Sequence, residues 1–156
     1  MSHTHTYRAT LTWEGTTADG YDHYDRTHRV TVPPAAEALT LSSDPAFKGD
    51  PENPNPEQLL LAAASSCQLL SFLAYAARSR IDVLAYADDA EALMPEDDPP
   101  TRITQVTLRP RITVAPGANV NRVYRLVEKA HADCYIANTL NAEMRIDAEV
   151  EVAATT

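Results

Sequence analysis

The sequence is poor in cysteine, in clustered basic residues and in N-terminal apolar residues. Its 156 residues include two cysteines and no run of five lysines or arginines, and the formal net charge is −9. An acidic surface repels nucleic acid and anionic membranes, so we expect neither as a partner. No apolar run follows Met1, so we expect no signal peptide and a cytoplasmic, reducing location. There a permanent structural disulfide is disfavoured, and paired cysteines are more often catalytic or metal-binding.

The length and the apolar content of 44% indicate one folded domain over residues 1–156, with residues 1–6 as a flexible tail. Alternating apolar residues predict a series of strands. These segments are 6–15, 21–32, 37–44, 81–94, 101–116 and 142–154. Ile103 is one residue out of phase with its segment, which predicts a bulge there.

A long uncharged segment predicts a helix from Asn55 to about Arg80. Asn55 is a good N-cap residue, Pro56 suits the first helical position, and Glu57 lies where the helix dipole favours an anion. The twenty residues 58–77 carry no charge, a length that could span a bilayer. Serine and glutamine inside this segment, with strand-like segments on both sides, favour instead a central helix that is buried on all sides.

A second helix is predicted over residues 117–134, where apolar residues recur at helical spacing and Cys134 closes the helix. The element order is therefore three strands, a helix, two strands, a helix and a strand. Strands that cluster in adjacent pairs, rather than alternating singly with helices, indicate an α+β fold with antiparallel sheet.

The two cysteines are the first candidates for chemistry. Cys67, inside the apolar helix, is by itself typical of a packed core residue, because free cysteine is among the most buried residue types and a thiol in apolar surroundings is inert. Cys134 makes a redox pair possible, although a separation of 67 residues excludes a CxxC motif. Zinc is the rival reading, since His131 and Cys134 share a helix face, but the usual four paired ligands are absent.

A reactive thiol also needs a cation or hydrogen-bond donors beside it. Arg26 and Arg29 are candidates, and both also fit solvated positions on a strand. Strand parity places Arg26 on the face of the neighbouring valines and Arg29 on the other face, which favours Arg26. Glu57 could hold such an arginine or only complement the helix dipole.

Several motifs together resemble one family. They are "LTWEG", "YDHYDRTHRVTV", "NPEQLLLAAASSC" leading into the apolar helix, and "AHADCYIANTL". The combination resembles the OsmC/Ohr thiol peroxidases, osmotically inducible protein C and organic hydroperoxide resistance protein, over about Tyr7 to Val152. The resemblance implies an OsmC/Ohr-like fold, with sheets wrapped around a central helix in an intertwined homodimer.

The same resemblance implies roles for four residues. Cys67 matches the peroxidatic cysteine, Cys134 the resolving cysteine, and Glu57 the glutamate that holds a catalytic arginine. The family's glycine-rich "GR" segment is absent, and Arg26 is matched through the pattern Tyr24-x-Arg26-x-His28.

The implied activity is a peroxidase that reduces organic hydroperoxides in oxidative-stress defence. It uses no metal or other cofactor, and a dithiol or a lipoylated protein restores the cysteines. About 15 Å of helix rise separates Glu57 from Cys67, so we expect a bent helix or a site shared between subunits. The alternative function is a binding protein for a small hydrophobic ligand with packed cysteines.

Overall fold

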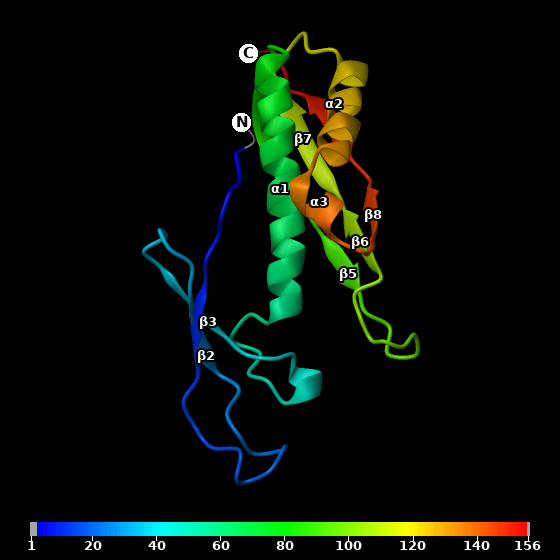
Figure 1. The fold of residues 1–156 in the computed structure, drawn as a ribbon. Coiled ribbons are helices and arrows are strands. Elements are labelled where there is room, and N and C mark those ends of the chain that lie inside the picture. The colour runs from blue at the N-terminus through cyan, green and yellow to red at the C-terminus, as the bar shows by residue number, and fades with distance from the viewer. Residues whose placement is uncertain (1–2, 156) are drawn as a thin grey trace. The chain divides into compact units, whose positions relative to one another are not determined.

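The computed structural model describes residues 3–155, which form two compact units. The first unit ends at Leu59 and the second begins at Leu60, and each is described by itself. Helix α1 (Pro56–Arg78) belongs to both (Figure 1). Of the predicted tail, residues 1–2 lie outside the described residues, and residues 3–6 are exposed without helix or strand. The single domain over residues 1–156 stays a prediction.

The first unit contains a three-stranded antiparallel sheet. Strands β1 (Thr10–Thr12), β2 (His28–Thr31) and β3 (Ala38–Leu41) pair in that order, and a short 3₁₀ helix, η1 (Pro45–Phe47), follows. All three predicted strands exist but are shorter than the patterns indicated. The predicted strand over 21–32 is wrong in its first half, because residues 21–23 form a turn in which the His23 N–H donates to the Gly20 carbonyl.

The second unit is built on three extended segments that each pass through two small sheets. Their strands are β4 (Val83–Asp88), β5 (Glu91–Leu93), β6 (Gln105–Leu108), β7 (Pro110–Val114), β8 (Glu143–Ile146) and β9 (Glu149–Val152). The sheet orders are β4-β7-β9 and β5-β6-β8, so the middle segment is central in both. The α+β class is confirmed. The expected antiparallel pairing holds for β4/β7 and β5/β6, whereas β8 and β9 return after two helices and pair in parallel.

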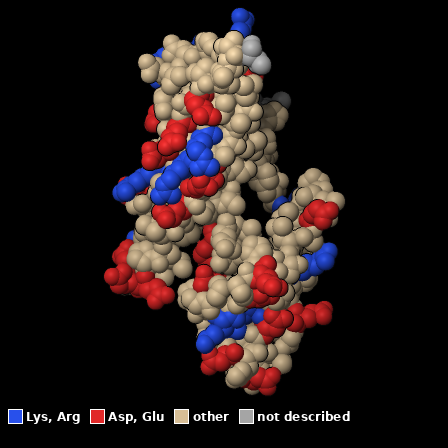
Figure 2. All heavy atoms as spheres, turned by 180° about the vertical axis from the view of Figure 1, so that it is seen from behind, with Lys and Arg blue, Asp and Glu red and all other residues tan. Residues whose placement is uncertain are grey.

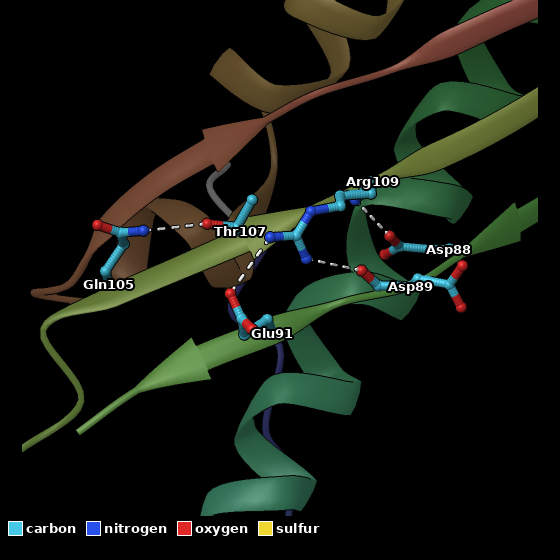
Figure 3. Close-up of polar contacts among 6 residues, drawn as sticks. All are labelled: Asp88, Asp89, Glu91, Gln105, Thr107 and Arg109. Atoms are coloured by element: carbon cyan, nitrogen blue, oxygen red, sulfur yellow. Dashed lines mark hydrogen bonds and ion pairs between the residues drawn. The ribbon is translucent and has the colours of Figure 1, made fainter.

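Each of the three segments is interrupted between its two strands, and the interruptions lie side by side. Asp88 makes hydrogen bonds at this point. Its carboxylate accepts the Arg109 backbone N–H at 2.7 Å and the Ser65 hydroxyl from α1. The Arg109 side chain bonds the Asp89 carbonyl at 3.3 Å and the Glu91 carboxylate at 3.2 Å (Figure 3). The bulge predicted at Ile103 is wrong, because Ile103 precedes β6, and the register shift of these sheets lies between Val83 and Ala85 of β4.

The start of α1 agrees with its predicted capping chemistry. The Asn55 side chain accepts the Gln58 backbone N–H at 2.8 Å, and the Gln58 side chain accepts the Asn55 backbone N–H at 2.9 Å. This reciprocal pair satisfies two of the helix's free donors. The helix ends at Arg78 rather than Arg80, whose φ of 58° is left-handed.

The expectation that α1 is buried on all sides is wrong for the single chain. Its buried residues form one stripe, Ala64, Gln68, Phe72 and Ala76. On the other sides Leu70 is 64% exposed and Leu73 is 37% exposed. The two small sheets and α2 cover only one side of α1. By length and by a mean hydropathy of 1.7, α1 could cross a membrane, and core helices of soluble proteins meet the same criteria.

Two further helices complete the second unit. Helix α2 (Val120–Ala132) is capped by Asn119, which accepts the Arg122 N–H at 3.0 Å, and it packs on Phe72 and Ala76 of α1 and on β7. A five-residue helix, α3 (Tyr135–Thr139), was not predicted. Cys134 is consequently the N-cap residue of α3, not the last residue of the second helix.

The surface carries the acidic excess expected from the sequence. Figure 2 shows Asp and Glu side chains interleaved with Lys and Arg on one face of the molecule. In ion pairs such as Arg109–Glu91 and Arg111–Asp89, both side chains are more than 40% exposed. Exposed pairs of this kind contribute little to stability.

Candidate functional site

The second unit brings the two cysteines together. Cys67 lies near the middle of α1 and is half-buried, whereas Cys134 is 1% exposed in the link between α2 and α3. Both are free thiols, and each lies close enough to shift the pKa of the other. The buried side of α1 determines which way Cys67 faces. Gln68, the next residue after Cys67, is buried, and its side chain donates to the Val127 carbonyl of α2 at 3.2 Å.

The surroundings of Cys67 favour its thiolate. Burial acts to raise the pKa of this thiol, but four hydrogen-bond donors outweigh burial and hold the pKa below its usual range. These donors are the Cys134 thiol, the backbone N–H groups of Ile136 and Tyr135, and the Ser71 hydroxyl. Two of the donors are main-chain groups at the start of α3, where helix N–H groups have no partner within the helix.

Cys134 has the opposite tendency. Burial raises the pKa of its thiol, and the hydrogen bond and negative charge of Cys67 raise it further. The Ala137 N–H lowers this pKa only in part. Of the two thiols, Cys67 therefore loses its proton more readily, and Cys134 keeps its proton to higher pH.

An open, mainly apolar pocket gives access to Cys67. It has a volume of about 510 Å³ and runs along α1 toward Arg78. Its lining residues are Ala63, Ser66, Cys67, Leu70, Ser71, Ala74, Tyr75, Arg78, Asp133 and Tyr135. An alkyl or aryl group could fill its apolar part while its reactive end reaches the sulfur.

The sequence reasoning missed three side chains of this site. Ser71 lies one helical turn after Cys67, and Tyr75 lies one turn further and donates its hydroxyl to the Asp133 carboxylate. That hydrogen bond, and then burial, raises the pKa of Tyr75. The spacing of four residues between Cys67, Ser71 and Tyr75 was the available signal, since such residues share a helix face.

Arg26 lies in the first unit and is 9% exposed, whereas Arg29 on β2 is exposed. Its guanidinium donates to the backbone carbonyls of Tyr24 at 2.8 Å and Tyr21 at 2.5 Å. It also stacks on both tyrosine rings, 3.8 Å and 4.8 Å from their centroids. These contacts organise the turn that precedes β2.

Glu57 is half-buried in the first turn of α1, as predicted. Within residues 3–155 no ion pair joins it to Arg26, whose polar contacts are with carbonyl groups. The roles proposed for these two residues therefore stay predictions.

Among the described residues, no group of three or more His, Cys, Asp or Glu side chains could hold a metal ion. His131 shares the end of α2 with Cys134, as the spacing indicated, but its Nδ1 atom is buried without a hydrogen-bond partner in the part of the chain described.

Comparison with known proteins decides the family. The family model described as OsmC-like protein matches residues 49–149. The chain belongs to the OsmC family. Both cysteines, Glu57 and the pocket on α1 fall inside the matched range, and Arg26 precedes it.

Solved structures of OsmC-like proteins share the fold. An OsmC-like protein of unknown function from Vibrio cholerae is 25% identical, with a TM-score of 0.83 over 95% of this chain and 100% of that one. An organic hydroperoxide resistance protein OsmC from Legionella pneumophila is 22% identical, with a TM-score of 0.70 over 97% and 100% of the two chains. The uncharacterized protein YmaD of Bacillus subtilis is 23% identical over 72% of this chain and 79% of its own length.

Substitution of Ser71 tests the electrostatics of this OsmC-family site. Ser71→Ala removes a donor to the Cys67 thiolate, so we expect the pKa of Cys67 to rise and alkylation by iodoacetamide at pH 7 to slow severalfold. Ser66→Ala is the matched control, because Ser66 lines the same pocket but gives Cys67 no hydrogen bond. Alkylation rates measured against pH in the Cys134→Ala background report Cys67 alone. Equal midpoints for the two serine variants would contradict the assignment.

Proposed function

We propose that this OsmC-family protein is a cysteine-based peroxidase that reduces organic hydroperoxides to alcohols and acts in oxidative-stress defence. One observation carries the proposal: Cys67, whose pKa is lowered, lines an apolar pocket and lies beside Cys134, whose pKa is raised. A thiolate is the species that attacks a peroxide, and a neighbouring thiol is the species that resolves the product. The proposed location is the cytoplasm.

The reaction has two balanced steps on the protein. The Cys67 thiolate attacks one peroxide oxygen, the O–O bond breaks, and the departing alkoxide takes up a proton to become the alcohol. Cys67 is then a sulfenic acid. Cys134 attacks its sulfur, an S–S bond forms, and the hydroxyl leaves with the Cys134 proton as water. A dithiol, such as that of a lipoylated protein, returns both cysteines to thiols and is itself oxidised to a disulfide.

The pocket supports an organic rather than an inorganic peroxide. Leu70, Ala63 and Ala74 form an apolar wall beside Cys67, and burial of an alkyl chain there stabilises the complex by roughly 0.8 kcal/mol for each buried methylene. The same wall also supports the second candidate, a non-catalytic binding protein for a small hydrophobic ligand, in which the thiols only pack.

Thiol counting distinguishes the two functions. After one equivalent of cumene hydroperoxide, we expect the wild type to lose both thiols, and its intact mass to fall by two hydrogens. Cys134→Ser should gain one oxygen on Cys67, and Cys67→Ser should stay unmodified. If both wild-type thiols survive the peroxide, the cysteines are packing residues and the ligand-binding function is the better one.

We further propose that Arg26 stabilises the Cys67 thiolate and the peroxide oxygens, and that Glu57 orients the Arg26 guanidinium. A guanidinium suits this role because it stays charged and donates in a fixed fork. For this, Arg26 must exchange at least one of its carbonyl contacts.

Arg26→Met, with Arg29→Met as the matched control, tests this role. Loss of this charged donor should slow Cys67 oxidation about 100-fold in Arg26→Met, with a smaller loss in Glu57→Gln. Stopped-flow oxidation and thermal unfolding are measured on each variant. A lower melting temperature with an unchanged oxidation rate would assign Arg26 to the turn alone.

We propose a homodimer that covers the exposed apolar face of α1. Leu70 and Leu73 leave more apolar surface exposed than a single-chain core helix would. Glu57 and Cys67 lie about 15 Å apart along one uninterrupted helix. A site shared between subunits could bring Glu57 of one copy close to Cys67 of the other.

Leu73→Asp tests the dimer, because Leu73 is exposed on α1 and does not line the pocket at Cys67. A charge at the centre of an apolar interface should raise the dimer dissociation constant by about 100-fold or more. Leu84→Asp is the control, because Leu84 is 54% exposed on β4 and does not line the pocket on α1. Sedimentation velocity over a concentration series measures both variants. A wild type that sediments as a monomer throughout would exclude the dimer.

A further inference from the structure

We propose that Tyr75 and Asp133 are positioning residues that hold Cys134 against Cys67 and so make disulfide formation faster than further oxidation. The proposal rests on the proposed peroxidase function. It concerns residues outside the four assigned to the chemistry, and it concerns the resolving step rather than the attack on peroxide.

The link that carries Cys134 has two residues between helices. Asp133 closes α2, with its N–H bonded to the carbonyls of His131 and Lys129, and Cys134 opens α3 with an extended backbone, φ −71° and ψ 117°. Asn138 closes the link from the other side, because its side chain donates to the Ala132 carbonyl at 3.0 Å. These bonds order the link internally but do not fasten it to α1.

The Tyr75 hydroxyl provides that attachment. It donates to the Asp133 carboxylate, one residue before Cys134, from a position two turns after Cys67 on α1. Within residues 3–155, the only other side-chain interaction between α1 and the link is that of the two cysteines themselves. The remaining α1–α2 hydrogen bond, from Gln68, reaches Val127 further back in α2. Lys129 lies 5.0 Å from the centroid of the Tyr75 ring and helps to hold the ring in place.

The attachment matters because two reactions compete for the Cys67 sulfenic acid. In one, Cys134 forms the disulfide and releases water. In the other, a second hydroperoxide transfers an oxygen to the sulfenate, which becomes a sulfinic acid while the hydroperoxide becomes an alcohol. The first rate depends on how often Cys134 occupies attacking geometry, and the second depends only on the peroxide concentration and access to the pocket.

Tyr75→Phe tests the attachment, because it removes one hydroxyl and keeps the ring. We expect disulfide formation from the sulfenic acid to be about tenfold slower, as a lost hydrogen bond to a charged group allows, and the rate of Cys67 oxidation by cumene hydroperoxide is measured separately. The share of sulfinic acid on Cys67 should rise accordingly with peroxide concentration. Rapid-quench thiol trapping and intact mass measure the three quantities.

Tyr124→Phe is the matched control. It also removes one tyrosine hydroxyl and its hydrogen bond. The Tyr124 hydroxyl, on α2, accepts the Val150 N–H of β9 at 3.2 Å, away from the cysteines. Thermal unfolding of both variants separates lost stability from lost positioning. Asp133→Ala should reproduce the effect of Tyr75→Phe, and the double variant should resolve no more slowly than either single one.

The outcomes separate the two proposals. If wild-type Cys67 is not oxidised, the peroxidase function and the positioning role both fail. If the wild type forms the disulfide and Tyr75→Phe resolves and over-oxidises as Tyr124→Phe does, the peroxidase stands and the positioning role is overturned.

Discussion

The packing of one side of α1 against α2 and the two small sheets determines the rest of the second unit. Four residues at a spacing of four, Ala64, Gln68, Phe72 and Ala76, are buried there and fix the rotation of the helix about its axis. A helix turns by about 100° per residue, so a different buried stripe would turn Cys67 away from Cys134. Phe72 supplies the largest buried volume, and its loss would cost roughly 3–5 kcal/mol. The chemistry of Cys67 therefore depends on apolar packing one turn along its helix.

Parts of this arrangement could be predicted because their causes are local. The cap of Asn55 on α1 involves atoms three residues apart, and residue types alone predict it. Strand parity favoured Arg26, and Arg26 is buried, but parity is not the cause: the segment is a turn, and the guanidinium packs on Tyr21 and Tyr24. The contacts of Arg26 come from turn geometry that alternation cannot encode.

Other parts depend on contacts between distant segments. A helix as short as α3 gives too few residues for a periodic pattern, so Cys134 was assigned to the helix before it. The hydrogen bond from Tyr75 to Asp133 joins residues 58 positions apart. Full burial of α1 was inferred from composition alone, and composition cannot distinguish surface covered by the chain itself from surface left for a second copy. The sequence therefore indicated the two cysteines as candidates, but not the hydrogen-bond donors and the pocket around Cys67.

The donors around Cys67 suit a sulfur whose charge changes during a reaction. In the second unit the thiolate is stabilised by a thiol, two backbone N–H groups and a hydroxyl, all of them neutral. A buried cation beside the sulfur would be left uncompensated when the thiolate becomes a neutral sulfenic acid or disulfide, and an unpaired buried charge is costly. Neutral donors avoid that penalty and can bond the oxygen of the sulfenic acid instead. The guanidinium of Arg26 has its own partners in the first unit, the carbonyls and rings of Tyr21 and Tyr24. The role proposed for Arg26 is therefore compatible with this pattern, because its charge has other partners when the sulfur is neutral.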